Sequence, residues 1–244
     1  MQVQFGVFMT STETKDTEFV DVTGIATTVE QAVLTRHSIR DYQSKPIEEK
    51  VLQDLFQKSL RAPSWKNSQP WKVHVVSGAR RDKMANLLVE RAKKGEPIPD
   101  TVWPASFPAN AKKRMFDLGM KIYGVAGIER KDKEARDNFM LRNFEFFGAP
   151  TAVFITTEFE LNFYIALDIG CYLNTLMLLA RSYGLGSVPQ AALSAFPEVV
   201  RSELNLSESE KVVCGLSLGY PKADSDLNRF HTPRESSGDI VTFY

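Results

Sequence analysis

The most apolar stretch of the chain, Phe163 to Ala180, limits the possible folds more than any other segment. Its length and composition fit either a membrane span or the core helix of a soluble protein. Asp168 and Asn174 fall inside it, and Arg181 follows it. A charged residue near the middle of a helix is costly in lipid. We therefore predict a helix over 163–183 that is buried on all sides, in a soluble cytoplasmic protein with no membrane partner.

The overall composition is that of a globular protein and excludes several function classes. Of the 244 residues, 43% are hydrophobic and 25% are charged, which is enough to form a core. The 30 Lys and Arg residues balance 30 Asp and Glu residues, so charge gives no reason to expect a nucleic acid partner. Cys171 and Cys214 form no CxxC pair, and we predict buried small hydrophobes in a reducing compartment.

We predict one domain preceded by an extension. The N-terminal residues lack the basic start and long apolar run of a signal peptide. Their polar middle predicts a flexible N-terminal extension over 1–25. No shift in composition and no internal repeat divides the remainder, so residues 26–244 are assigned to a single domain.

Short apolar runs alternate with helical patterns, which favours a layered α/β fold. Ala152 to Ile155 is a continuous apolar run, as expected for a central strand covered on both faces. Trp71, Val73 and Val75 alternate with other positions and predict a half-buried strand. Strands are expected at about 72–77, 151–156, 186–189 and 211–219.

Several helices have recognisable ends. Thr27 and Thr28 are followed three residues later by Glu30 and Gln31, which predicts a capped helix that ends near Arg36. Further helices are predicted from Pro46, in a first turn, to Pro63, and over 80–94, over 109–147 and after Pro197.

The segment from Gly95 to Pro108 is rich in proline and carries Trp103 and Phe107. Such a loop is either a mobile cover over a pocket or an arm packed on a partner. The C-terminal tail, from Lys222, ends in apolar residues. It needs a surface to pack on, for which a second subunit is one candidate.

Residues 36–40, with the sequence RHSIR, have the composition of a phosphate site. Two guanidiniums and a hydroxyl lie just past a predicted helix end. Arginine offers planar pairs of donors and serine a short one, as phosphate recognition requires. A solvated basic turn is the alternative interpretation.

Three other segments combine polar groups with turn residues. Residues 62–71, APSWKNSQPW, suit the edge of a flat heterocycle, although an ordinary turn has the same composition. Residues 184–190, GLGSVPQ, place glycines where backbone amides can face a ligand. Arg234, with Asn228 upstream, lies in a polar tail where arginine is usually solvated.

Other nucleotide-binding and catalytic motifs are missing from the sequence. No GxGxxG follows a predicted strand, and the Walker A, HExxH and GxSxG patterns do not occur. His37, His74 and His231 are scattered along the chain, so neither a metal site nor a histidine-based triad is supported.

In their order, these segments resemble the FMN-dependent nitroreductase family. The resemblance spans roughly residues 26–244, and Pro97 to Pro108 matches the aromatic insertion of its larger members. The matching elements are RHSIR at 36–40, APSWKNSQPW at 62–71, Asp168-Ile169-Gly170, GLGSVPQ at 184–190, and GLSLGYP at 215–221 with Arg234 downstream.

The resemblance implies an α+β fold with a central mixed, mainly antiparallel sheet flanked by helices. It also implies an intertwined homodimer with FMN at the subunit interface. Trp65 departs from the smaller residue of many relatives, which puts the width of the pocket in doubt. The implied FMN-binding residues are Arg36, His37, Ser38, Arg40 and Arg234 at the phosphate, ribityl and pyrimidine end, Val188, Pro189 and Gln190 near flavin N5, and Pro63, Ser64, Trp65 and Asn67 from the other subunit.

The implied activity is NAD(P)H-dependent, two-electron, ping-pong reduction of nitroaromatics, quinones or similar small electron-poor acceptors. The cofactor carries the redox chemistry, so no catalytic side chain and no metal ligand is nominated. Lys66 is a candidate contact for NADH or NADPH, and Tyr123, Trp103 and Phe107 are candidates for the acceptor pocket. The alternatives are a reductive dehalogenase or other flavin reductase, a flavin-binding protein without turnover, and a flavin-free nucleotide-binding protein.

Overall fold

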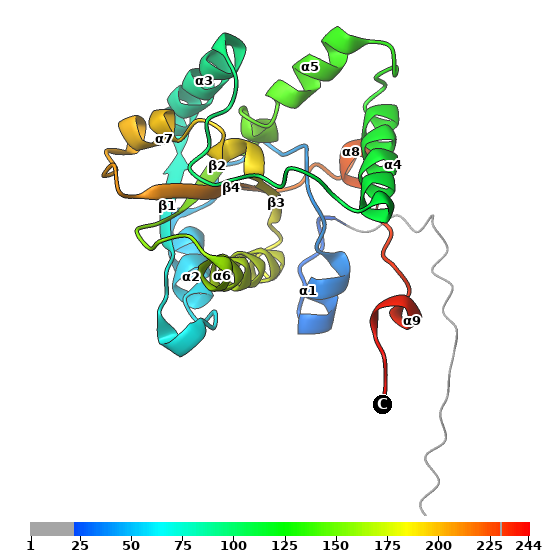
Figure 1. Ribbon diagram of the computed structural model, residues 1–244, viewed down its shortest axis with the longest axis horizontal. Helices are drawn as coiled ribbons and strands as arrows, with labels where there is room; N and C mark the ends of the chain where they lie inside the picture. Colours follow the sequence, from blue (N-terminus) through cyan, green and yellow to red (C-terminus); the bar gives the residue numbers. More distant parts are fainter. Residues whose placement is uncertain (1–21, 230) are drawn as a thin grey trace, which may run out of the picture.

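The computed structural model describes residues 22–229 and 231–244, with a four-stranded sheet at its centre (Figure 1). Across the sheet the strands follow the order β1-β2-β4-β3, and each neighbouring pair is antiparallel. The strands are β1 (Lys72–Ser77), β2 (Thr151–Thr157), β3 (Gly186–Gln190) and β4 (Lys211–Gly219). The predicted strand positions and the α+β class are confirmed.

β2 is the central strand that its apolar run predicts. All seven of its residues are buried. Ala152 and Phe154 belong to the core cluster on one face of the sheet, and Val153 and Ile155 belong to the cluster on the other. This division follows because successive side chains of a strand point to opposite faces.

One face of the sheet is covered by α3 (Gly78–Lys94) and α7 (Pro197–Leu204) (Figure 1). Met84, Leu88 and Val200 of these helices are fully buried there. Pro197 opens α7, as predicted, because its missing N–H is not needed in a first turn.

The opposite face is covered by α2 (Glu49–Ser59) and α6 (Phe163–Arg181) (Figure 1). Leu55 of α2 and Tyr172 of α6 are fully buried in this layer. Pro46 lies before α2 rather than in its first turn, because the backbone remains extended up to the N-cap residue of the helix.

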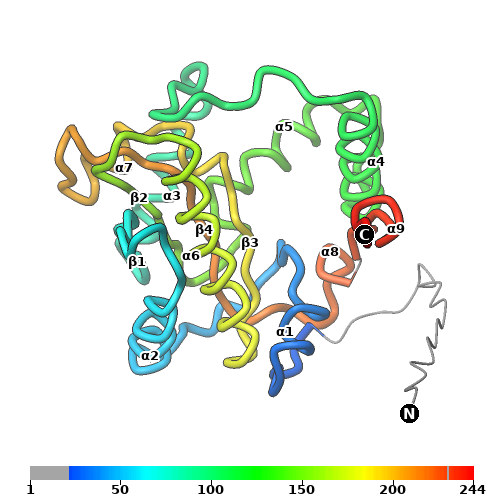
Figure 2. Tube along the Cα trace, turned by 60° about the horizontal axis from the view of Figure 1, so that its bottom comes forward, coloured from blue at the N-terminus to red at the C-terminus, as the bar shows by residue number. Residues whose placement is uncertain are grey.

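α6 is the predicted core helix, and by length and composition alone it could also cross a membrane. The prediction that it is buried on all sides is wrong for the single chain. Phe163 is 74% exposed and Leu167 is 53% exposed. The sheet covers one side of the helix and α1 and α2 flank it, which leaves its outer face open near the N-terminus (Figure 2).

The segment predicted as one helix over 109–147 is instead an arm of two helices, α4 (Ala109–Val125) and α5 (Lys133–Leu141). Gly127, at φ +68°, turns the chain out of α4. Asp132 then caps α5 by accepting a hydrogen bond from the Ala135 N–H at 2.8 Å. The arm projects beside the sheet (Figures 1 and 2), and α4 contains no buried residue.

The remaining elements are short. α1 (Val29–Thr35) begins at the predicted cap, where the Thr28 hydroxyl accepts a hydrogen bond from the Gln31 N–H at 3.1 Å. The others are the 3₁₀ turns η1 (Trp65–Asn67), η2 (Phe146–Gly148) and η3 (Ala191–Ser194) and the single-turn helices α8 (Asp226–Arg229) and α9 (Ser237–Ile240).

Three smaller predictions can be compared with the burial of particular residues in the structure. Val76, not Val75, is the buried valine near the end of β1, because Val76 packs under α3. Cys171 and Cys214 are only partly buried, although burial raises the pKa of the Cys214 thiol to about 12. The extension predicted over 1–25 falls largely outside the described residues; within them, Val22 is already buried.

Candidate functional site

Residues 36–40 lie along the free edge of β3, and this places the first and third motifs side by side. The Ile39 N–H donates to the Ser187 carbonyl at 3.1 Å, and Ser38 forms a parallel bridge with Ser187. Gly186 permits this approach, because a Cβ there would lie 2.5 Å from Cγ1 of Ile39 and 2.8 Å from Cγ of Pro221. The glycine is thus required for close packing rather than for an unusual backbone angle.

Asn228 holds the same segment against the C-terminal region. Its Oδ1 accepts hydrogen bonds from the N–H groups of Arg40 (2.8 Å) and Asp41 (3.2 Å). Its Nδ2 donates to the carbonyls of Asp41 (2.7 Å) and Lys222 (3.0 Å). The side chain is fully buried. A neutral amide therefore fixes the course of the backbone around Arg40 without placing a negative charge beside it.

Positive charge accumulates at the start of this segment. Arg36 is half-buried, and burial together with neighbouring Arg234 lowers the pKa of its guanidinium. The rings of His37 and His231 lie 4.8 Å apart. Burial lowers the pKa of both histidines, and the pKa of His231 is lowered further by His37, Arg234, Lys121 and Arg36. We call Arg36, His37, His231 and Arg234 the cationic cluster; its charge comes from the two arginines, because the lowered pKa values leave both histidines neutral near pH 7.

The cationic cluster has an unsatisfied donor or acceptor. Nε2 of His231 is buried and has no hydrogen-bond partner within the described ranges. Among the residues that the structure describes, neither Arg36 nor His231 forms an ion pair with a carboxylate. Buried polar groups are normally paired, so the chemistry of this cluster suits an anion with several acceptor oxygens.

Residues 188–190 of β3 offer a ligand their backbone groups rather than their side chains. Val188 and Gln190 are buried, and Pro189 is partly exposed. The Gln190 amide donates to the Asn143 carbonyl at 2.9 Å and its Oε1 accepts from the Ser217 hydroxyl. Its side chain is therefore occupied within the protein, and only the main chain of this strand remains available to a ligand.

Residues 62–69 form a strained loop that α6 holds in place. Lys66 (φ 50°), Asn67 (φ 60°) and Gln69 (φ 46°) all have left-handed backbone, a conformation that is costly for residues other than glycine. Both carboxylate oxygens of buried Asp168 accept from the Trp65 N–H, at 3.0 and 3.1 Å, and one accepts from the Ser68 hydroxyl at 3.1 Å. Asp168 thus stabilises the strained loop.

The side chains of this loop point outward. Trp65 is 58% exposed and lies 5.0 Å from the Tyr164 ring. Pro63, Lys66 and Asn67 are also exposed, while Ser64 is half-buried and its hydroxyl accepts from the Gln69 N–H at 3.0 Å. The loop is rigid in its backbone and open on its surface, as a contact for another molecule would be.

The two predicted halves of the FMN site lie at opposite ends of α6. Asp168 holds the 62–69 loop, and Arg181 donates to the Thr35 hydroxyl at 3.3 Å, next to residues 36–40. At about 1.5 Å per residue, positions 168 and 181 are about 20 Å apart along the helix axis. Figures 1 and 2 place α1 and α2 on opposite sides of α6. One chain therefore brings together residues 36–40, 186–190 and the C-terminal residues, but not the 62–69 loop.

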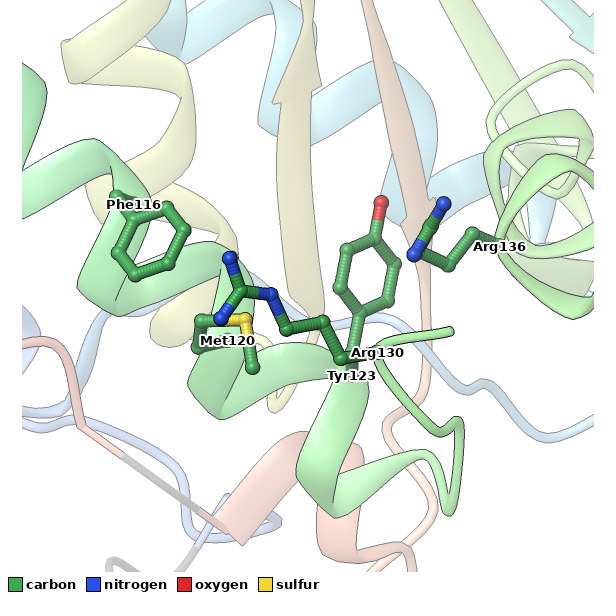
Figure 3. A pocket seen from close by; sticks show the side chains of 6 residues that line it. Phe116, Met120, Tyr123, Arg130 and Arg136 are labelled. Carbon is green, nitrogen blue, oxygen red and sulfur yellow. The ribbon is translucent and has the colours of Figure 1, made fainter. Parts of the chain in front are cut away.

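The predicted acceptor residues are dispersed. Tyr123 lines a cavity beside α4 (Figure 3). Trp103 and Phe107, each 38% exposed, lie in the preceding proline-rich loop. That loop is anchored at Asp100, which pairs with Arg201 at 2.6 Å and accepts from the Val212 N–H at 2.8 Å.

Known proteins share the fold of this chain. The profile of the Nitroreductase family matches residues 33–220. The 4-nitrobenzoate reductase of Pseudomonas putida is 32% identical over 211 residues, which cover 86% of this chain and 93% of that protein. The crystal structure of the FMN-dependent nitroreductase NfnB from Mycobacterium smegmatis in complex with NADPH has a TM-score of 0.85 at 30% identity, covering 88% of this chain and 97% of that one. The chain belongs to the nitroreductase family.

Membership confirms the predicted family and fold, and with them a soluble oxidoreductase enzyme of the nitroreductase type. The family match includes the motifs at 36–40, 62–71 and 184–190. It ends before Arg234, so the placement of Arg234 in this nitroreductase comes from the cationic cluster alone.

Several residues of the site escape sequence reasoning. His231 reads as an isolated histidine, yet it packs on His37. Asn228 attracts attention only as a neighbour of Arg234, and its carbonyl lies 2.7 Å from Nε2 of His37, 191 residues away in the chain. Arg142, which donates to the Arg40 carbonyl at 3.3 Å, gives no motif signal at all.

We call residues 36–40, 186–190 and the C-terminal residues around Asn228 the first half-site. Replacing Asn228 should loosen this half-site of the nitroreductase. Asn228→Ala removes four hydrogen bonds of its side chain and leaves buried backbone groups unpaired. We expect the free energy of unfolding to fall by about 2–3 kcal/mol, measured by urea denaturation. Asn138→Ala, at an exposed position of α5, is the matched control. An Asn228→Ala protein as stable as this control would contradict the anchoring role.

Proposed function

We propose that this nitroreductase uses bound FMN to carry electrons from NADH or NADPH to nitroaromatics, quinones or similar electron-poor acceptors. The observation that carries the proposal is the cationic cluster. Arg36 and Arg234 lie close enough to affect each other, no carboxylate offsets Arg36, and Nε2 of His231 is buried without a partner in the described residues. The phosphate of FMN would supply both the negative charge and the acceptor oxygens that this cluster lacks.

The other predicted residues fit the rest of the flavin. Arg40 has no carboxylate partner among the described residues, and burial lowers the pKa of its guanidinium, which nevertheless stays charged at neutral pH. At the pyrimidine end it would offset negative charge that develops during reduction. The main chain of Val188 to Gln190 would lie near flavin N5, and Ser38 would bind the ribityl chain.

When bound, FMN supplies the two-electron redox chemistry. The overall reaction converts NAD(P)H, one proton and a nitro compound into NAD(P)⁺, a nitroso compound and water. The side chains of this protein bind and orient the reactants, and none of them is required to form a covalent bond. Lys66 is the proposed contact for the nicotinamide cofactor, and Tyr123 with the aromatic loop residues Trp103 and Phe107 is proposed to border the acceptor.

We propose an intertwined homodimer with FMN at its interface. Asp168 holds the 62–69 loop, with Pro63, Ser64, Trp65 and Asn67, and Arg181 lies next to residues 36–40 about 20 Å further along α6. A second copy would unite the two. Large exposed apolar side chains on α1, α4, α6 and the C-terminal tail support this pairing. Exposed among them are Val29, Leu34, Met115, Phe116, Phe163, Leu167, Phe243 and Tyr244.

NADPH and a nitrobenzoate are the first donor and acceptor to use. NfnB of Mycobacterium smegmatis was crystallised with NADPH, and the relative from Pseudomonas putida is a 4-nitrobenzoate reductase. We also propose a cytoplasmic location, which the free thiols of Cys171 and Cys214 support.

Reduction assays with several acceptors under anaerobic conditions distinguish the proposed activity from its alternatives. With NADPH as donor, we expect steady-state reduction of nitroaromatics and quinones. Turnover confined to halophenols would instead indicate a reductive dehalogenase on the same scaffold. A yellow protein whose flavin absorbance is not bleached by NADPH or NADH would indicate flavin binding without turnover.

Arg234→Ala tests the phosphate site directly. Loss of one charge-assisted hydrogen bond should weaken FMN binding roughly 10- to 100-fold, measured by quenching of flavin fluorescence in the apoprotein. Riboflavin, which has no phosphate, should bind the variant and the unaltered protein equally well. Equal losses for FMN and riboflavin would place Arg234 away from the phosphate.

Mixed dimers test the shared site. Arg36→Ala alters the first half-site and Asn67→Ala alters the loop, so a dimer containing one copy of each variant has one fully intact site and one doubly altered site. We expect half of its FMN to bind with unaltered affinity, measured by titration of the purified mixed dimer. If each site were formed by one chain alone, every site in that dimer would contain one substituted residue. No site would then bind FMN with the affinity of the unaltered protein.

A further inference from the structure

His37 is a buried histidine whose two ring nitrogens both face carbonyl oxygens. Its Nδ1 lies 2.9 Å from the Thr35 carbonyl, and its Nε2 lies 2.7 Å from the Asn228 carbonyl. Both are ordinary hydrogen-bond distances. Because the residue is only 8% exposed, solvent offers little compensation at either nitrogen.

A neutral His37 ring satisfies only one of these two contacts. A neutral imidazole has one N–H group and a lone pair on its other nitrogen, and a carbonyl oxygen can only accept a hydrogen bond. One ring nitrogen of neutral His37 therefore donates to its carbonyl, while the other directs a lone pair at an oxygen. The imidazolium form has two N–H groups and satisfies both contacts.

The surroundings oppose this second proton when no anion is bound. Burial lowers the pKa of His37, the two carbonyl contacts raise it, and the positive charges of Arg181 and Arg36 lower it again, with a lowered pKa as the net result. The geometry of the contacts thus favours the imidazolium, while burial and the neighbouring charges favour the neutral ring. A nearby negative charge would shift the balance to the imidazolium.

The charged and titratable groups around His37 come from four segments of the chain. Asp41, the carboxylate nearest to His37 in the sequence, pairs with Lys222 at 3.0 Å. The other groups are Arg36 of the 36–40 segment, Arg181 of α6, His231 and Arg234 of the C-terminal region and, acting on His231, Lys121 of α4.

We infer that His37 takes up a proton from solvent when a phosphate binds at the cationic cluster, so that FMN and one proton bind together. The inference rests on the proposed function, which assigns the phosphate of FMN to this cluster. A phosphomonoester carries close to two negative charges above pH 7, which offset the charges of Arg36 and Arg234. The proton completes the second N–H···O contact of His37, and no bond of FMN is formed or broken.

The direction of the pH dependence follows from this exchange. Because the complex holds one more proton than its separate components, FMN binds more tightly as the pH falls. The effect is confined to the interval between the lowered pKa of His37 in the free protein and its higher pKa in the complex. Within that interval, Kd for FMN rises by up to about tenfold per pH unit. Below about pH 6 the phosphate itself gains a proton, and binding weakens again.

Calorimetric titration of the apoprotein with FMN measures the proton directly. Titrations at pH 7.0 in buffers with different ionisation enthalpies give the number of protons taken up per FMN, which we expect to lie between about one half and one. His37→Gln keeps a polar side chain that cannot be protonated, so it should bind FMN without this uptake. His74→Gln is the matched control, because His74 lies on β1 and pairs with Glu210 at 2.7 Å; it should keep the uptake.

Nitrogen NMR of labelled histidine side chains is a second measurement, which does not depend on the folding of His37→Gln. The chain has three histidines, so the spectra of His74→Gln and His231→Gln identify the His37 signals by elimination. At pH 7.0 these signals should change from those of a neutral ring to those of an imidazolium when FMN is added.

Three results would overturn the inference while leaving the proposed function intact. They are FMN binding without proton uptake, an uptake that persists in His37→Gln, and a His37 ring that stays neutral in the FMN complex. Failure of the proposed function looks different, because the unaltered protein would then bind no FMN, and the inference would fail with it.

Discussion

Both halves of the proposed flavin site depend on two buried charges at opposite ends of α6. Asp168 accepts hydrogen bonds from a strained loop, and Arg181 donates to the carbonyls of Val22, Gly24 and Leu185. A buried charge is tolerated only when its hydrogen-bonding groups are satisfied. Each charged group therefore holds a segment of chain in place through its hydrogen bonds: Asp168 holds the 62–69 loop, and Arg181 holds the backbone around Val22 and Gly24. A rigid helix between them fixes the spacing of the two half-sites.

The first half-site gathers positive charge, and the carboxylate of Asp41 beside it is paired with Lys222 at 3.0 Å. Its backbone is organised by Asn228, a neutral amide, and by hydrogen bonds to β3, and the Asp41–Lys222 ion pair lies beside them. A carboxylate in that place would stabilise the cluster in the empty protein and would compete with an anionic ligand. With a neutral anchor, a bound anion would relieve the repulsion between Arg36 and Arg234, so part of the folding free energy is exchanged for affinity.

The sequence predicts most of the sheet because its strands are short apolar runs whose pattern depends on local residues. It predicts the 36–40 and 62–71 segments for the same reason, since their donors are consecutive. It does not predict the pairing of His37 with His231 or the anchoring by Asn228, because these contacts join residues almost 200 positions apart. The sequence also does not predict the exposed face of α6. An apolar helix face has the same residue pattern whether the sheet of the same chain or a second chain covers it.

The arm of α4 and α5 links the proposed assembly to the proposed acceptor contact Tyr123. α4 is amphipathic but buries none of its residues within the chain, so little of its position is determined by the domain core. Packing in a dimer would bury part of α4, and the free energy gained would hold in place the face of α4 that carries Phe116 and Tyr123. The proposed flavin site, by contrast, is built on β3 and α6, which the core fixes directly. We therefore expect substitutions in the arm to alter the proposed acceptor contact while the residues of the proposed flavin site keep their positions.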